Sequence, residues 1–288
     1  MSRPVEVVHA AAIVLQDAGV GSPANDARLL LAHAMGTDVT RALLSDEVSE
    51  SQVAAFDQLV AGRCAGTPLQ HLTGVAWFRT TSVEVGPGVF VPRPETEVMV
   101  GWVLDALREL GGGRVVELCV GSGAILKSIA TELPHAELDL HGVELSEDAL
   151  AYAARNLSGL GVDLRQGDLA DAFVDLEGEV DLVVANPPYV PLSAWESVPA
   201  EVRDHDPALA LFSGADGLDA PRAVAARAFR LLRPGGVVAC EHAEVQSEQM
   251  VDLFRTAGFV DVRDNLDLTS RPRYVSARKP DAASTWQD

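Results

Sequence analysis

The segment Asn186-Pro187-Pro188-Tyr189 combines residue types that suit the recognition of a flat, nitrogen-bearing group. It follows the apolar run 182–185, which predicts a short buried strand. Asn186 offers a side-chain oxygen and Pro187 a backbone carbonyl, so together they can accept two N–H hydrogen bonds from one planar nitrogen. The proline rings fix φ, and Tyr189 can stack on a flat group. The alternative is a rigid turn that only ends the strand.

A glycine-rich loop lies upstream, in the stretch VVELCVGSGAI. Gly121 and Gly123 stand between a predicted strand and a predicted helix, where glycines let a ligand approach the backbone. Glu144 ends the next predicted strand about 20 residues on, where an acid can accept both hydroxyls of a ribose.

The same loop departs from the dinucleotide fingerprint. Leu126 stands where that fingerprint has glycine or alanine. We place Glu117 inside the loop, where a carboxylate would repel a pyrophosphate but suit a cationic ligand. These features favour a nucleoside with a positive group, and S-adenosyl-L-methionine is one. The alternative is a merely structural turn.

Asp168, in the stretch RQGDL, follows the third strand of this series. From there it can accept a hydrogen bond from an adenine amino group. Taken alone, the residue fits a helix N-cap equally well.

The composition bounds the function. A formal net charge of −20 argues against a chain that neutralises duplex nucleic acid over a broad surface, although a local basic patch is compatible with it. The cysteines lie far apart, at 64, 119 and 240, without a CxxC or Cys/His cluster, so we expect no metal site and a reducing, cytoplasmic compartment. The amphipathic N-terminus and the lack of a long apolar run predict neither a signal peptide nor a membrane span.

The elements that would position these residues follow from periodicity. Residues 1–70 show the amphipathic spacing and capping residues of a small helical bundle. From Trp77 the pattern WFRTTSVEVGPGVFVP predicts a β-hairpin, followed by a helix from about Pro94. Strands then alternate with helical segments and end in two terminal strands, which predicts a doubly wound, mostly parallel sheet.

A strand followed by Asn-Pro-Pro-Tyr, downstream of the Gly loop and the acid, resembles the signature of methyltransferases that act on planar nitrogens. The resemblance widens to the HemK/PrmC family, the release factor glutamine methyltransferases. The combination of VPRPETE upstream with NPPY downstream is more specific than either motif alone. The matching pieces are GTPLQHLTGVAWF, VFVPRPETE, the Gly loop, NPPYVP, DPALALFSGADGL, LLRPGGVVACEH and RPRYVSARK.

The resemblance implies an α/β fold, a Rossmann-like class I SAM-dependent methyltransferase domain over 93–279. It further implies a small all-α domain over 1–72 that binds the protein substrate, a hairpin linker over 73–92 and a disordered tail over 280–288. The implied reaction methylates the side-chain amide nitrogen (N5) of the glutamine in the GGQ motif of peptide chain release factors. We expect a monomer without nucleic acid or membrane partners.

The resemblance also assigns residues. Catalysis would rest on Asn186, Pro187 and Tyr189, and substrate binding on these together with Pro188 and Arg93. Glu95 would line the site from the linker side. The cofactor would be bound by Phe90, Glu117, Cys119, Val120, Gly121, Ser122, Gly123, Glu144, Leu145, Asp168, Leu169 and Asn186.

The sequence departs from the family pattern at several positions. Cys119 stands where such loops often have a glycine, and Leu169 replaces an aromatic residue found beside the adenine in some relatives. Lys127 and Ser128 occupy places usually filled by small apolar residues. The segment 204–206 (Asp-His-Asp) could be read as metal ligands, but a polar loop near the substrate fits better because no partner cluster exists.

Two other functions remain compatible with these motifs. A DNA or RNA amino-methyltransferase, acting on N6 of adenine or N4 of cytosine, would share the Asn-Pro-Pro-Tyr chemistry but would need a basic groove. A catalytically degenerate protein that binds the cofactor and docks on release factors would be the non-enzyme alternative, supported only by Cys119, Lys127 and Leu169.

Overall fold

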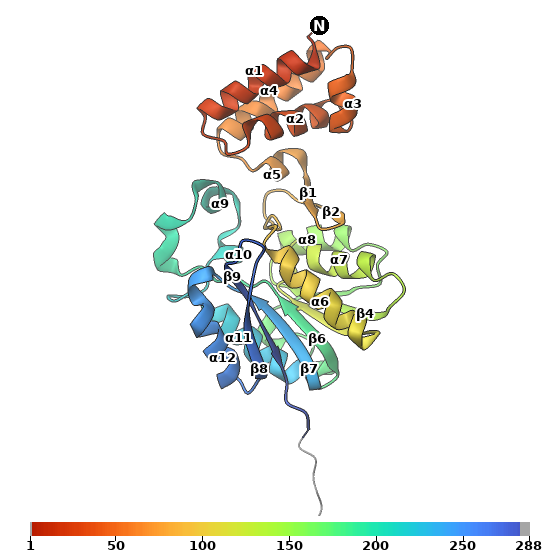
Figure 1. The fold of residues 1–288 in the computed structure, drawn as a ribbon, viewed down its shortest axis with the longest axis vertical. Coiled ribbons are helices and arrows are strands. Elements are labelled where there is room, and N and C mark those ends of the chain that lie inside the picture. The colour runs from red at the N-terminus through yellow and green to blue at the C-terminus, as the bar shows by residue number, and fades with distance from the viewer. Residues whose placement is uncertain (1, 283–288) are drawn as a thin grey trace, which may run out of the picture. The chain divides into compact units, whose positions relative to one another are not determined.

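The computed structural model describes residues 2–282, which divide into two compact units (Figure 1). One unit comprises the residues up to Val75 together with Pro199–His205, and the other comprises Ala76–Val198 together with the residues from Asp206 onward. Of the predicted tail 280–288, residues 283–288 lie outside the described part of the chain. Within residues 2–282 no helix has the length and apolar character needed to cross a membrane.

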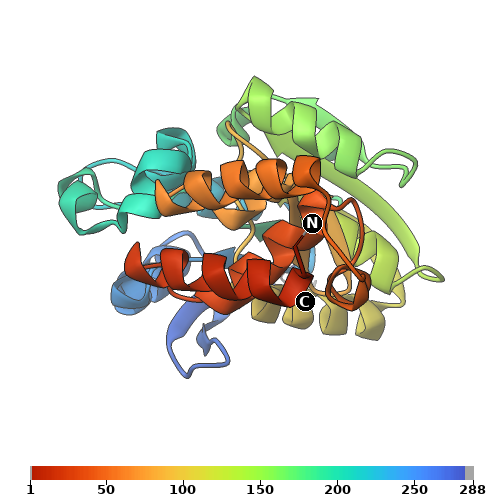
Figure 2. The same ribbon diagram turned by 90° about the horizontal axis from the view of Figure 1, so that it is seen from above.

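The first unit is built from helices around a small apolar core. Helices α1, α2 and α4 pack against one another (Figure 2). Ser49 and Gln52 form a capping box at the beginning of α4, so these two residue types determine where that helix starts. The helices of this unit are α1 (Pro4–Asp17), α2 (Pro23–Ala34), α3 (Val39–Leu44), α4 (Glu50–Cys64), α5 (Leu69–Thr73) and α9 (Ala200–His205).

Helix α9 comes from a distant part of the chain, and a buried arginine attaches it to the unit. Arg63 donates a hydrogen bond from Nε to Asp26 at 2.8 Å and one from Nη1 to Glu201 at 3.0 Å. The two carboxylates compensate the desolvated guanidinium.

A two-stranded hairpin, β1 (Val75–Phe78) with β2 (Thr81–Glu84), confirms the predicted change of pattern near Trp77. Alternation along β1 buries Ala76 and Phe78 and leaves Trp77 with 76% of its surface exposed.

The core of the second unit is a seven-stranded sheet in the order β5-β4-β3-β6-β7-β9-β8. Strands β3 to β7 pair in parallel, and β9 pairs antiparallel with β7 and β8. The predicted doubly wound, mostly parallel sheet is therefore confirmed. The strands are β3 (Gly112–Leu118), β4 (Glu137–Glu144), β5 (Asp163–Gln166), β6 (Val180–Ala185), β7 (Leu232–Glu241), β8 (Val260–Leu266) and β9 (Pro272–Arg278).

Helices cover both faces of this sheet, because alternate strand residues point to opposite sides. Val115 and Leu182 join one apolar core with α6 (Thr96–Leu110), α7 (Ala124–Glu132) and α8 (Glu147–Asn156). Val116 and Val183 join the other core with α11 (Asp219–Leu231) and α12 (Ser247–Thr256). The remaining elements are η1 (Leu169–Asp171), η2 (Val174–Leu176), η3 (Leu192–Ser197), α10 (Ala208–Leu211) and η4 (Glu244–Gln246).

Element boundaries differ from the prediction by a few residues. The helix expected from about Pro94 begins at Thr96. The helix after β4 ends at Asn156, and Gly159 and Gly161 adopt positive φ beyond it.

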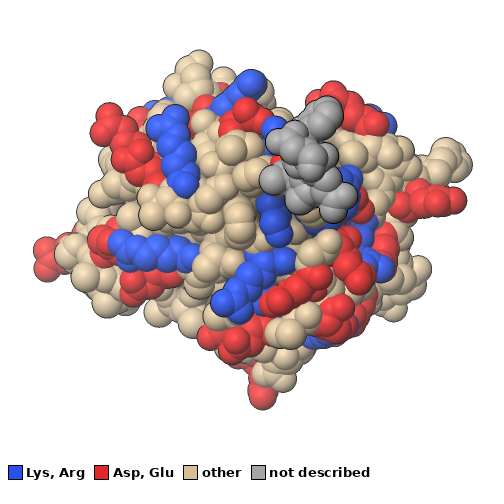
Figure 3. Space-filling view, turned by 90° about the horizontal axis from the view of Figure 1, so that it is seen from below, with Lys and Arg blue, Asp and Glu red and all other residues tan. Residues whose placement is uncertain are grey.

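Despite the excess of acidic residues, at least one face of the molecule carries charges of both signs (Figure 3). On the face shown in Figure 3, Lys and Arg side chains lie interspersed with Asp and Glu.

Candidate active site

The Gly loop, Glu144 and Asn186 come together at the carboxyl ends of β3, β4 and β6, which are neighbours in the sheet. The strand order reverses between β3 and β6, and sheets of this kind bind ligands in the crevice at that point. The loop 119–123 follows β3, Glu144 ends β4 and Asn186 follows β6. The parallel register places these three departures from the sheet side by side.

The Gly loop turns through positive φ angles at Cys119 (65°), Gly121 (56°) and Gly123 (82°). A Cβ on Gly121 would meet no atom within 4 Å, so its backbone faces open space, as a ligand-binding loop requires. A Cβ on Gly123 would lie 3.0 Å from Leu157, so this glycine permits close packing on α8. A glycine adopts the positive φ of Cys119 without strain, but a cysteine does not. The cysteine at this position, where the family often has glycine, therefore strains the backbone.

Glu144 is buried, and its carboxylate is fixed by two backbone donors. Oε2 accepts from the Gly121 N–H at 2.8 Å and Oε1 accepts from the Ser146 N–H at 2.8 Å. Each carboxylate oxygen has a further lone pair, so the group can also accept two hydroxyls. The acceptor lone pairs of this carboxylate therefore fit the hydroxyls of a nucleoside ribose.

The prediction that Glu117 lies inside the Gly loop is wrong. The residue lies within β3, because Leu118 continues the pairing of that strand with both neighbours. Its Oε2 accepts from the Leu126 N–H at 3.2 Å, at the beginning of α7. Burial raises the pKa of Glu117 well above its usual value, the Leu126 bond opposes this, and nearby Glu144 adds to it. A cationic ligand would favour the ionised form of this carboxyl.

Asp168 and Leu169 lie after β5, and the structure realises the capping alternative for the aspartate. Asp168 Oδ1 accepts from the Ala170 N–H at 2.9 Å and caps η1. The side chain is exposed, as is that of Leu145, while Leu169 is half-buried. A contact of Asp168 with adenine stays a prediction.

Asn186 is half-buried and is anchored by the first residue of α6. Its Nδ2 donates to Thr96 Oγ1 at 3.3 Å. The amide oxygen of Asn186 is thereby turned away from Thr96 and can accept from a substrate N–H. Pro187 is buried, and Pro188 is half-buried.

Tyr189 is held at both its hydroxyl and its backbone. The hydroxyl donates to Glu241 Oε1 at 3.3 Å, and the carbonyl accepts from Gln246 Nε2 at 2.9 Å. A Cβ on Gly217 would lie 2.3 Å from the Tyr189 carbonyl oxygen, so only glycine fits there. Burial raises the pKa of Tyr189, and the charge of Glu241 adds to this, so the phenol stays protonated.

Three polar residues that the sequence motifs did not reveal support the site: Thr96, Asn156 and Glu241, each at most 7% exposed. Asn156 Nδ2 donates to the Ser122 carbonyl at 2.9 Å and so fixes the Gly loop. Glu241 ends β7, next to β6 in the sheet. The rule that selected Glu144, an acid at the carboxyl end of a buried strand, would also have selected Glu241.

The linker-side residues form their own cluster. The Arg93 guanidinium lies 4.9 Å from the centroid of the Phe90 ring and pairs with Asp206. Glu95 is exposed and directly precedes α6. Asp206 is thus part of an ion pair, and among the described residues no group of three His, Cys, Asp or Glu side chains could hold a metal ion.

Two departures from the family pattern have structural partners. Lys127 Nζ donates to the Ser82 carbonyl at 2.6 Å and ties α7 to β2. Ser128 is fully buried, and its hydroxyl donates to the Ala124 carbonyl at 2.9 Å within the helix. Neither contact involves the predicted site.

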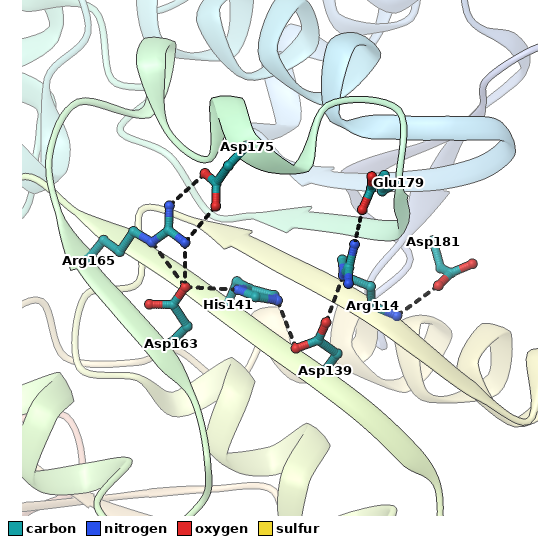
Figure 4. Close-up of polar contacts among 8 residues, drawn as sticks. All are labelled: Arg114, Asp139, His141, Asp163, Arg165, Asp175, Glu179 and Asp181. Atoms are coloured by element: carbon teal, nitrogen blue, oxygen red, sulfur yellow. Dashed lines mark hydrogen bonds and ion pairs between the residues drawn. The ribbon is translucent and has the colours of Figure 1, made fainter.

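A second charged cluster lies at the opposite, amino end of the sheet (Figure 4). Asp139 pairs with Arg114 and His141, and Asp163 pairs with His141 and Arg165. An open pocket beside it is lined by Gly113, Arg114, Glu137, Leu138, Asp139, Glu179 and Asp181.

Comparison with known proteins extends the likeness over more than nine-tenths of the chain. Residues 6–74 match the PrmC N-terminal domain, and residues 115–206 match a methyltransferase domain. A release factor glutamine methyltransferase of Streptomyces coelicolor is 53% identical over 268 residues, covering 92% of this chain and 94% of the relative. The protein of that name from Mycolicibacterium smegmatis is 43% identical over 282 residues, covering 97% and 99%.

Proposed function

The chain belongs to the release factor glutamine methyltransferase family, and we propose that it methylates the side-chain amide nitrogen (N5) of the glutamine in the GGQ motif of peptide chain release factors. The observation that carries the proposal is the anchored Asn186, which follows β6 beside the Gly loop and presents its amide oxygen. The likeness to curated enzymes over more than nine-tenths of the chain supports it.

The cofactor is S-adenosyl-L-methionine, which supplies a methyl group bound to a positively charged sulfur. Glu144 would accept the ribose hydroxyls, because its carboxylate is already oriented by the Gly121 and Ser146 N–H groups. The open backbone at Gly121 leaves room for the ligand. The buried Glu117 carboxyl favours a cation over a pyrophosphate.

The substrate residues act by positioning. A carboxamide nitrogen has a delocalised lone pair, so the site must fix both of its N–H bonds to aim the lone pair. Asn186 Oδ1 and the Pro187 carbonyl accept hydrogen bonds from these two N–H groups, and the ring of Tyr189 bounds the flat group. No strong base is required, because a methylated, cationic amide nitrogen is acidic and releases its proton readily.

We also propose roles for the parts of the chain. The helical domain 1–72 recognises the release factor, the hairpin linker 73–92 joins it to the catalytic domain 93–279, and Arg93 and Pro188 contact the substrate segment. The protein acts as a monomer in the cytoplasm, where release factors work, and it does not bind nucleic acid directly.

Mass spectrometry of a release factor, after incubation with the protein and S-adenosyl-L-methionine, tests the function. We expect one added methyl group on the GGQ glutamine and none on a release factor in which that glutamine is replaced by asparagine. Label on duplex DNA with none on the release factor would instead identify an amino-methyltransferase of nucleic acid. Calorimetric cofactor binding without transfer to either substrate would identify a degenerate binding protein.

A further inference from the structure

The linker segment 82–88 lies against α8, and Asn156 at the end of that helix bonds its backbone twice. Asn156 Oδ1 accepts from the Glu84 N–H at 2.7 Å, and Asn156 Nδ2 donates to the Glu84 carbonyl at 2.9 Å. Two residues further on, a Cβ on Gly86 would lie 2.4 Å from the Tyr152 hydroxyl oxygen, so the linker approaches the helix closely. Residues 152 and 156 are four apart and share one face of α8.

The same face of α8 sets the direction of the linker. A Cβ on Gly88 would lie 3.0 Å from the Cβ of Asp148, in the first turn of α8. The linker therefore runs from Asn156 toward the beginning of the helix, which closely follows Glu144 in the chain. Phe90, which we expect to bind the cofactor, comes two residues after Gly88. The contacts along α8 thus carry the linker toward the proposed cofactor site.

The Gly loop is held by the same amide. Asn156 Nδ2 also donates to the Ser122 carbonyl at 2.9 Å, and the N–H of that peptide unit, on Gly123, donates to the Val120 carbonyl at 2.9 Å. Glycine adds little stiffness of its own, so contacts from outside must fix the loop. Asn156 is 7% exposed, and solvent therefore competes little for its bonds.

We infer that Asn156 is a positioning residue for the cofactor, because its one buried amide joins the linker backbone to the Gly loop. Two of its hydrogen bonds go to Glu84 and one goes to Ser122, which uses both Nδ2 protons and determines the orientation of the amide. The linker thereby holds the Ser122 carbonyl through Asn156. The inference rests on the proposed function, with the cofactor bound at the Gly loop and Glu144.

An isosteric substitution tests the amide. Asn156→Asp keeps the shape and the acceptor but removes both donors, so a carboxylate would face the carbonyls of Glu84 and Ser122. We expect the cofactor Kd from calorimetry to rise about tenfold to a hundredfold. At saturating cofactor, kcat should stay within about threefold of wild type, because the substrate segment 186–189 is untouched. Asn265→Asp is the matched control, since the Asn265 amide also donates to backbone carbonyls but lies on β8, and its Kd should not change.

Paired substitutions at Glu84 test the linker side without altering the Gly loop. Glu84→Pro removes the N–H that Asn156 accepts, so the cofactor Kd should rise about tenfold. Glu84→Ala keeps that N–H and removes only an exposed side chain, so its Kd should equal that of wild type. Circular dichroism establishes that both variants are folded.

A second linker variant avoids proline. Lys127 Nζ donates to the Ser82 carbonyl at 2.6 Å, so Lys127→Met loosens the same segment and should raise the cofactor Kd about threefold to tenfold. Lys279→Met is its matched control, because Lys279 Nζ makes the same kind of bond, at 2.7 Å, to the Leu232 carbonyl at the amino end of β7.

The outcomes separate the inference from the proposed function. A wild-type Kd in Asn156→Asp, or a loss of kcat there without a change in Kd, would overturn the inference. A raised Kd in Asn156→Asp with none in the linker variants would also overturn it, because Asn156 would then act on the Gly loop alone. A wild type that binds cofactor but leaves the release factor unmodified would instead refute the proposed function.

Discussion

The two ends of the parallel sheet carry carboxylates in opposite electrostatic situations. At the amino end, hydrogen bonds from Arg165 lower the pKa of Asp163 and hold that of Asp175 at about 2. Figure 4 shows these pairs joined in one chain of contacts. At the carboxyl end, burial raises the pKa of Glu117 and Glu241.

The direction of the shift separates the roles of the two ends. A carboxylate with a lowered pKa has its countercharge within the chain, so it adds to folding stability and has little attraction left for a ligand. A carboxyl with a raised pKa reduces stability when it is ionised, and such groups concentrate at functional sites. We therefore expect substitutions at the carboxyl end to change chemistry or binding, and those at the amino end to change stability only.

The largest effect is expected for Asn186→Ala. It removes the oxygen that holds one substrate N–H, so kcat should fall by about a thousandfold or more, as when a donor or acceptor that orients the transition state is lost. Cofactor binding by calorimetry should persist, because Glu144 and the Gly loop are untouched. Radiolabel transfer to the release factor measures the loss.

Asn265→Ala is the matched control, since Asn265 lies on β8 and its amide bonds Ser276 at 2.9 Å. That variant should keep wild-type turnover. Unchanged turnover in Asn186→Ala would contradict the role assigned to Asn186. It would also contradict the expectation that substitutions at the carboxyl end of the sheet change chemistry or binding.

The next effect concerns the two ends of one strand, β4. Glu144→Ala should weaken cofactor binding by roughly 1–3 kcal/mol, the cost of leaving buried hydroxyls unpaired. Glu137→Ala, at the exposed amino end of the same strand, should leave the dissociation constant unchanged. Isothermal calorimetry measures both, and equal affinities in the two variants would count against the ribose assignment.

The sequence was most informative where chemistry is local in the chain. A motif can be recognised when its residues lie within a few positions of one another, as in the Gly loop with Gly121 and Gly123 and in the segment 186–189. Strand and helix periodicity likewise predicted the sheet, since burial on two faces is visible in each segment.

The support behind the site could not be predicted in that way. Thr96 reads as an ordinary helix start and Glu241 as an ordinary strand end. Only the sheet order β3-β6-β7, with α6 against the sheet, brings them to Asn186. Asp168 illustrates a different difficulty, because its residue type fits two roles. The structure shows its capping hydrogen bond with the Ala170 N–H, and its contact with adenine stays a prediction.

A smaller effect is expected on stability, and with the opposite sign from the usual core substitution. The folded-state pKa of Glu241 is raised to about 7 from its usual 4.5, so its stabilising contribution is full below the lower value and is lost as pH rises through the higher one. Glu241→Gln should therefore be more stable than wild type by up to about 3 kcal/mol near pH 8 and equal to it near pH 4.5. Urea unfolding at both pH values measures this, and a destabilised variant at the higher pH would contradict it.

The smallest effect is expected for Arg114→Met at the amino end. Arg114 pairs with Asp139 and Glu179, both about half exposed, so removing the guanidinium should cost at most about 1 kcal/mol of unfolding free energy, with methyl transfer unchanged. Partial burial raises the pKa of Asp139, but hydrogen bonds from Arg114 and His141 outweigh it, so the net shift is downward. The difference from wild type should thus be present at neutral pH and lost as pH falls through that lowered pKa.

High salt should also shrink the Arg114→Met difference, because exposed pairs are screened. The comparison would fail if Arg114→Met lost more unfolding free energy than Glu241→Gln gains, or if its loss did not depend on pH. Either result would mean that the amino-end charges are not solvent-exposed pairs that compensate one another, unlike Glu117 and Glu241. Reduced methyl transfer in Arg114→Met would break the comparison more directly, since it would connect the far end of the sheet to the chemistry.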